Sequence, residues 1–224
     1  RPMSPPADGA AAFTPTARSK ARRRPQRAAY DEAAVYAILD AGVMAHVGYA
    51  IDGQPYVTPT AYWREGRKLY WHGAAASRML KTVGQGVPVC VTVSFLDGFV
   101  VGRSGFIHSL NYRSVMAFGR ARLVTDLEEV RTAMDAFIDR LYAGRSVKLR
   151  PASETELKQV ALVEMEIEEA SAAIRRALEL VDAVRRAVRH VPPGLGDVGG
   201  CRAHAGRGVR GGAVMTVTNR LFEE

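Results

Sequence analysis

Residues 54–79 place two β-forming runs, a tight turn and a helix start in direct succession. The runs are residues 55–60 and 69–72, which are rich in the β-branched and aromatic residues that favour strands. Gly66 lies between them and can take the positive φ that a tight hairpin turn requires. We therefore expect an antiparallel hairpin here.

A helix start follows the second run. Ser77 is a good helix N-cap, which would bring its hydroxyl, Arg78 and the first backbone N–H groups of the helix together. Because helix starts attract anions, we expect a phosphate-bearing cofactor to lie across this sheet with its phosphate near Arg78.

The rest of the central region alternates β-forming runs with a few helical segments. Asp52-Gly53 predicts a further hairpin turn, Asp97-Gly98 another turn, and Gly119 a bulge or a close approach of backbones. The expected strands are about 43–50, 54–63, 67–72, 87–95, 99–101, 112–124 and 160–168, and the expected helices about 31–41, 77–85, 127–142 and a short one capped by Ser153. Short strands with tight turns predict a mainly β fold with flanking helices (α+β), closed into a small barrel.

Charge divides the 224 residues into three parts. The net charge is +8, but residues 31–174 hold fifteen basic against seventeen acidic side chains. We expect a disordered basic arm over 1–29, a folded domain over 30–174, and a basic Gly/Arg-rich tail over 175–224, helical to about 190 and then disordered. Because the basic excess lies outside the domain, no specific nucleic-acid partner is expected. The Arg-rich arm is interpreted as a solvated leader, with weak contact to polyanions or a membrane surface as the alternative.

Three further expectations concern processing and metals. The Gly/Arg/Ala composition of the tail is consistent with a shifted reading frame near Ile174, a hypothesis that alternative frames of the coding DNA would test. No apolar run is long enough to span a membrane, and the chain start lacks an apolar signal core, which favours a cytoplasmic protein. Cys90 and Cys201 give neither a disulfide framework nor metal-ligand spacing, and Cys90 is expected to be a buried structural thiol.

Several segments share their order and spacing with one known family. They are Pro55-Tyr56-Val57-Thr58-Pro59, Leu69-Tyr70-Trp71-His72-Gly73, Ser77-Arg78-Met79, and Asn111-Tyr112-Arg113-Ser114-Val115 followed by Phe118-Gly119-Arg120-Ala121. Across residues 30–174 the chain resembles the flavin-binding split barrels related to pyridoxamine-phosphate oxidase, in particular their nitroimidazole-resistance branch. The resemblance implies FMN as cofactor, a homodimer, and a Greek-key antiparallel split β-barrel.

The resemblance also gives roles to individual residues. Arg78, helped by Ser77, is expected to bind the flavin phosphate, and Met79 replaces a lysine of the oxidases, which removes one charged contact. His72 is expected to face the flavin and to orient a substrate or move a proton, with a purely structural histidine as the alternative. The other expected cofactor contacts are Val57, Thr58, Pro59, Thr60, Trp71, Tyr112, Arg113 and Ser114. Ordinary strand packing is the alternative for the strand residues, and Trp71 is equally suited to fill the barrel wall.

These roles predict an FMN-dependent oxidoreductase that acts on a small molecule, with a nitroaromatic compound as one candidate. The alternatives are a non-catalytic flavin-binding or storage protein, a deazaflavin-dependent relative, and a vitamin B6 phosphate oxidase. The last is disfavoured because the chain lacks the C-terminal Trp and Arg substrate motif of those oxidases.

Overall fold

The structure is a computed structural model that describes residues 11–101, 105–176 and 215–217. These residues form two compact units. The larger unit contains residues 11–94 and 114–173, and the smaller contains 95–101, 105–113, 174–176 and 215–217. All the expected site residues except Tyr112 and Arg113 belong to the larger unit.

Strands dominate the described chain, and the helices are few and mostly short. The strands are β1 (Ala28–Ala29), β2 (Met44–Ile51), β3 (Gln54–Glu65), β4 (Lys68–Ala74), β5 (Gln85–Val101), β6 (Ser109–Val124), β7 (Val160–Glu166), β8 (Glu169–Arg175) and β9 (Met215–Val217). The α-helices are α1 (Glu32–Ala41), α2 (Arg78–Val83), α3 (Leu127–Leu141) and α4 (Glu154–Lys158), and the 3-10 turns are η1 (Pro25–Arg27), η2 (Gly105–Ile107) and η3 (Ser146–Lys148). Among these helices, none combines the length and the apolar character needed to cross a membrane.

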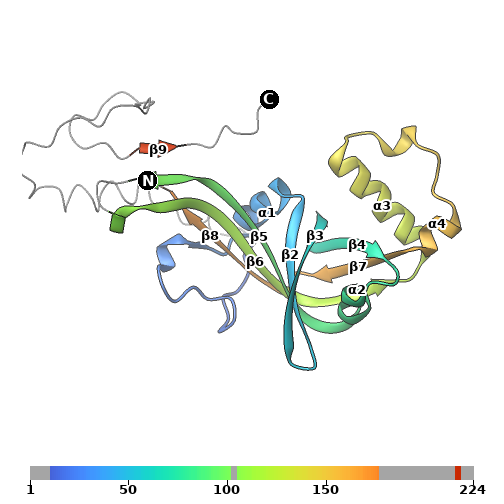
Figure 1. The fold of residues 1–224 in the computed structure, drawn as a ribbon, viewed down its shortest axis with the longest axis horizontal. Helices are drawn as coiled ribbons and strands as arrows, with labels where there is room; N and C mark the ends of the chain where they lie inside the picture. The colour runs from blue at the N-terminus through green and yellow to red at the C-terminus, as the bar shows by residue number, and fades with distance from the viewer. Residues whose placement is uncertain (1–10, 102–104, 177–214, 218–224) are drawn as a thin grey trace, which may run out of the picture. The chain divides into compact units, whose positions relative to one another are not determined.

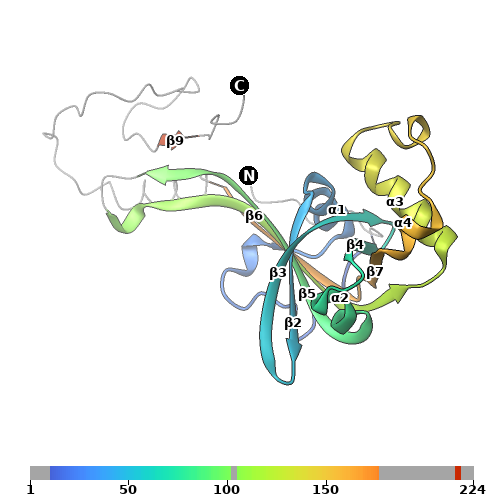
Figure 2. The ribbon, with the colours of Figure 1, turned by 45° about the vertical axis from the view of Figure 1, so that its right-hand side comes forward.

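The strands form one sheet in the order β1-β8-β6-β7-β4-β3-β2-β5-β9, and β5 also pairs with β6. This additional pairing closes the series from β6 to β5 into a barrel, so the predicted split-barrel fold with flanking helices is confirmed. The pairs β2–β3, β3–β4, β4–β7 and β6–β7 are all antiparallel. The β2–β3 hairpin is a long ribbon in both views of the fold (Figures 1 and 2).

Both predicted hairpin turns are present. Asp52 and Gly53 connect β2 to β3 with φ of 50° and 80°, the pair of positive values that suits the twist of the flanking strands. Gly66 connects β3 to β4 with φ of 56°. These turns fix the register that places Tyr49 opposite Tyr56 and Tyr62 opposite Trp71.

Buried residues line both faces of the β3–β4 pair. Tyr62, Leu69 and Trp71 are fully buried among the strands. On the other face, Trp63 and Tyr70 pack with α3 and α4 in a second hydrophobic cluster that includes Val130, Ala133, Leu157 and Leu162. Both views show α3 alongside β4 and β7 (Figures 1 and 2). His72 lies on this face, because its ring contacts Phe137 of α3.

The N-terminal segment differs from the prediction of disorder over 1–29. Residues 11–29 lie against the barrel: Phe13 is 3% exposed, its backbone N–H donates to the carbonyl of Tyr30, and Arg67 stacks over its ring. Arg18 pairs with Glu169 at 2.6 Å and stacks over Phe118. Composition suggested disorder because these few anchoring residues are hidden in a Pro/Ala/Arg-rich sequence.

Three other predictions need correction. β5 runs straight through Asp97-Gly98, where a turn was expected, and the strand expected over 160–168 ends at Glu166 before β8 begins. Glu164 in β7 is 5% exposed and pairs with Lys68 at 3.1 Å and Arg122 at 2.7 Å. The two cations compensate its buried charge. Cys90 is half-buried rather than buried, and most of the tail after residue 176 lies outside the described residues.

Candidate functional site

Arg78 begins α2 and is exposed to solvent. The predicted N-cap is present, because the Ser77 hydroxyl oxygen accepts a hydrogen bond from the N–H of Leu80 at 3.4 Å. The hydroxyl proton of Ser77 can still be donated to a ligand. Since α2 has only six residues, the charge available here comes from the Arg78 guanidinium rather than from a long helix dipole.

An aromatic pair supports the Arg78 side chain. The guanidinium carbon lies 4.8 Å from the ring centre of Tyr56, and Tyr56 stacks on Tyr49 with ring centres 5.6 Å apart. The Tyr49 hydroxyl lies 3.3 Å from the hydroxyl of Thr58. In the described part of the chain no carboxylate pairs with Arg78, so its charge is available to an anion. The structure therefore brings together Arg78, Tyr56 and Thr58, as well as Thr60 on the same face of β3.

The other expected β3 contacts lie on the opposite face. Side chains alternate along a strand, so Val57 and Pro59 point away from the Tyr56–Thr58 face. Val57 is 68% exposed, and Pro59 is also exposed. The four β3 residues expected to line one flavin therefore lie on two different faces of the strand, and only their backbone groups are common to both faces.

His72 lies on the same face as Trp63 and Tyr70, beneath α3. Its ring contacts Phe137 edge-on at 4.8 Å between ring centres and lies 6.1 Å from Trp63. The Nδ1 atom is buried and has no hydrogen-bond partner. Burial lowers the pKa of His72 below its usual value of 6.5, because the charged imidazolium loses solvation there, so the ring is held neutral near pH 7.

Two expected contacts are core residues in this structure. Trp71 is 0% exposed and fills the barrel wall, which was the alternative prediction. Met79 is 7% exposed and points into the core, so it does not reach the solvent-facing side of Arg78. Both side chains therefore pack in the hydrophobic core of the protein.

The remaining expected contacts lie on β6. Arg113 pairs with Asp97 at 3.0 Å and stacks over Phe95 within the smaller unit. Tyr112 belongs to the same unit, whereas Ser114 is half-buried in the larger one. A cofactor contact by these three residues stays a prediction.

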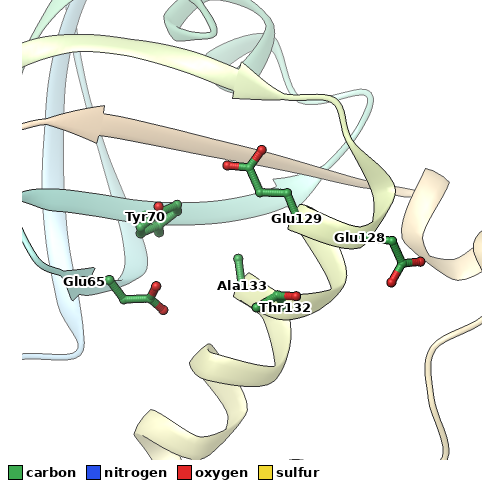
Figure 3. Close-up of a pocket in the computed structure, with 6 residues that line it drawn as sticks. All are labelled: Glu65, Tyr70, Glu128, Glu129, Thr132 and Ala133. Atoms are coloured by element: carbon green, nitrogen blue, oxygen red, sulfur yellow. The ribbon is translucent and has the colours of Figure 1, made fainter.

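A pocket of about 340 Å³ opens elsewhere, between the β3–β4 pair and α3 (Figure 3). It is lined by Glu65, Tyr70, Glu128, Glu129, Thr132 and Ala133. Three carboxylates would repel a phosphate, and none of the expected site residues contributes to it. Glu65 also accepts a hydrogen bond from the indole N–H of Trp63 at 3.2 Å, which gives it a structural role. No group of metal-ligating side chains occurs in the residues that the structure describes.

Sequence reasoning missed two residues that shape these surfaces. Tyr56 lies within the quoted motif, and its position two residues before Thr58 on one strand face was a usable signal. Phe137 lies in α3, a helix that was predicted without any role for this residue. Its contact with His72 depends on how α3 packs, which the local sequence does not encode.

The chain is similar to several known proteins. The family profile described as pyridoxamine 5'-phosphate oxidase matches residues 31–174. The chain belongs to this family. The flavocytochrome Anf3 from Azotobacter vinelandii has a similar structure, with 41% sequence identity over 73% of this chain and 76% of that chain, and a TM-score of 0.69.

Two more distant structures share the fold of this pyridoxamine 5'-phosphate oxidase family member. An FAD and heme binding protein from Mycobacterium smegmatis is 24% identical over 86% of this chain and 100% of that chain, with a TM-score of 0.64. A candidate 5-nitroimidazole antibiotic resistance protein from Bacteroides thetaiotaomicron is 23% identical over 65% of this chain and 84% of that chain, with a TM-score of 0.53. The search of curated proteins finds no match.

Proposed function

We propose that this chain is a flavin-dependent oxidoreductase that acts on a small molecule. The observation that carries the proposal is the exposed Arg78 guanidinium, which is stacked over Tyr56 and has no carboxylate partner among the described residues. Similarity to a flavocytochrome at 41% identity supports a flavin as the anionic ligand. The bound flavin would supply the electron transfer, and the protein would hold and orient it.

The residues around Arg78 suit the phosphate end of a flavin. A guanidinium can donate two parallel hydrogen bonds to phosphate oxygens, and the Ser77 hydroxyl adds a third donor. Tyr56 limits the positions open to the guanidinium, which lowers the entropy lost on binding. Thr58 and Thr60 add hydroxyl groups along the same strand face.

FMN is the flavin that we propose, because the family resemblance implies it and one phosphate is sufficient for Arg78. FAD is the alternative, since its diphosphate offers the same oxygen chemistry. Mass identification of the released cofactor distinguishes the two. A deazaflavin also differs from both flavins in mass, so the same mass identification distinguishes this alternative.

The activity is tested by anaerobic reduction of the purified yellow protein with a nicotinamide donor, followed by addition of a nitroaromatic acceptor. Reoxidation of the flavin with stoichiometric loss of the acceptor is expected. A protein that releases a flavin but is reduced by no donor would instead be a storage or carrier protein. A protein that takes up no flavin at micromolar concentration would contradict the proposal.

We also propose that the chain functions as a homodimer. Val57 and Met44 expose 68% and 57% of their surface on the outer face of the β2–β3 hairpin. Exposed apolar side chains on one sheet face are typical of an association surface. In the resembled family the flavin lies between two subunits, so flavin binding and dimerisation are expected to be linked.

A further inference from the structure

Five arginines stack over an aromatic ring in the part of the chain that the structure describes. In four of them the guanidinium also pairs with a carboxylate; these pairs are Arg18 with Glu169, Arg64 with Asp40, Arg67 with Glu32, and Arg113 with Asp97. The fifth, Arg78 over Tyr56, has no carboxylate partner among the described residues. Because a stacked guanidinium can still donate hydrogen bonds in its own plane, Arg78 is held in place without the anion that the other four have.

The ring beneath Arg78 belongs to a stack that reaches into the core. Tyr49 on β2 pairs directly with Tyr56 on β3, and their rings are nearly parallel, at 18°, with centres 5.6 Å apart. Arg78 is exposed, Tyr56 is half-buried, and Tyr49 is only 7% exposed. The Tyr49 hydroxyl also lies 3.3 Å from the hydroxyl of Thr58 on the same face. The buried ring of Tyr49 therefore fixes Tyr56, and Tyr56 offers the guanidinium a defined position.

The hairpin turn and the helix start bring the three side chains of this stack together. Asp52 and Gly53, with φ of 50° and 80°, set the register of β2 and β3. A slip of one residue would turn Tyr56 to the opposite face of the sheet. The backbone of Arg78 is fixed separately, because Ser77 caps the helix that Arg78 begins. Only the torsions of the long Arg78 side chain remain free, and the stack restricts these.

From this arrangement we propose that Tyr49 and Tyr56 are positioning residues that hold the Arg78 guanidinium ready for the phosphate of a flavin phosphate ester. They thereby set how strongly the protein prefers FMN or FAD to riboflavin, which has the same ring system without phosphate. This inference rests on the flavin-binding function proposed above and deepens it. Tyr49 acts through Tyr56, and Tyr56 acts through Arg78. A guanidinium that is already positioned loses less rotamer freedom on binding, and only a ligand that carries phosphate benefits.

The test is a fluorescence titration of the full chain with FMN, FAD and riboflavin. The measured quantity is the dissociation constant of riboflavin divided by that of the tighter-binding phosphate ester. For the wild type this ratio should be roughly ten to a hundred, the effect of one charge-assisted contact. Tyr49→Leu should lower the ratio roughly three- to tenfold by weakening the binding of the phosphate ester alone. A variant that merely loosens the barrel would weaken riboflavin binding as well and would leave the ratio unchanged.

Tyr70→Leu is the matched control. Tyr70 is also 7% exposed and stacks on Trp63, with ring centres 5.5 Å apart and an angle of 17°, but on the face of β3 and β4 away from Arg78. This variant should therefore keep the wild-type ratio. Tyr49→Phe retains the ring without the hydroxyl and should also keep the ratio. Because Tyr56 is half-buried, Tyr56→Leu is the second test variant if Tyr49→Leu does not fold, and its ratio should fall in the same way.

A double variant tests whether the stack acts through Arg78. Once Arg78→Ala has removed the guanidinium, adding Tyr56→Leu should not change the ratio further, because residues that act through one contact are not additive. An unchanged ratio in Tyr49→Leu and Tyr56→Leu, or an equal fall in Tyr70→Leu or Tyr49→Phe, would overturn the proposal. A wild type that binds riboflavin as tightly as both phosphate esters would also overturn it, while the flavin-binding function stands. A wild type that binds none of the three ligands would reject that function and this inference together.

Discussion

At the scale of single residues, Arg78 carries the prediction for the flavin. Arg78→Ala removes a charge-assisted hydrogen bond to phosphate, which contributes about 1.5–3 kcal/mol. The dissociation constant of the flavin should therefore rise roughly ten- to a hundredfold, as measured by fluorescence titration. His72→Ala should leave flavin affinity almost unchanged, because His72 lies on the other face of β3.

Lys81→Ala is the control for this measurement. Lys81 is an exposed cation on the same helix, so the variant lowers the net charge equally without touching Tyr56. If Arg78→Ala and Lys81→Ala weaken flavin binding by the same amount, Arg78 acts only through the net positive charge of the surface. The prediction that Arg78 contacts the flavin phosphate would then be wrong.

Gly119 gives a second prediction at this scale, this time for stability. A Cβ atom at Gly119 would lie 2.2 Å from the carbonyl oxygen of Glu166 and 2.9 Å from Met165 Cγ. Gly119→Ala must separate β6 from β7 locally, so we expect the free energy of unfolding to fall by about 1–3 kcal/mol or more. Urea denaturation measures the loss. Gly105→Ala, where nothing lies within 4 Å of the added atom, should be nearly neutral.

At the scale of elements, the start of α4 shows how one carboxylate holds a short helix. Glu156 accepts hydrogen bonds from Arg150 at 2.6 Å and 2.9 Å, and from the N–H of Ser153 at 2.8 Å, which completes a capping box. The Arg150 contact, followed by those of Ser153, holds the pKa of Glu156 well below its usual 4.5. The contribution of ionised Glu156 to the free energy of unfolding is therefore fully present above pH 4.5. It is lost as the pH falls towards the lower pKa that Glu156 has in the folded state.

Glu156→Gln keeps the capping geometry and removes the charge. The stability difference between wild type and Glu156→Gln should be largest at neutral pH and should shrink as pH falls below about 4.5. Unfolding midpoints measured from pH 7 to pH 3 test this, with Glu154→Gln on the same helix as the control. A difference that stays constant over this range would show that the Glu156 charge does not couple to folding.

The elements also show which parts of the fold the sequence specifies locally. Asp52-Gly53 and Gly66 specify their turns directly, because few other residues adopt the required φ. Ser77 and Ser153 were both identified as helix caps for a similar local reason. The order of residues 11–29 and the burial of Glu164 were not predictable, because each depends on partners distant in the chain, such as Glu169 for Arg18 and Arg122 for Glu164.

At the scale of the whole molecule, the candidate site likewise combines residues that the local sequence predicts with contacts that depend on distant parts of the chain. Arg78 and Ser77 could be placed from local spacing and family resemblance. The separation of Val57 and Pro59 from Thr58 follows from strand alternation alone. The cover that Phe137 forms over His72 required the packing of α3 on the sheet, which no local pattern contains.

Assembly provides the last prediction. The wild type should have twice the chain mass in size-exclusion chromatography with light scattering. Val57→Asp places a charge on the exposed outer face of β3 and should yield single chains, because an unpaired charge is costly at an apolar interface. Val147→Asp is the matched control, since Val147 is 85% exposed in η3, away from β3 in the sequence, and this variant should remain dimeric.

Because the flavin site is expected to need both subunits, flavin content should fall together with dimer content in Val57→Asp. A single chain that retains flavin with wild-type affinity would refute the link between assembly and cofactor binding, while leaving the role of Arg78 open to its own test.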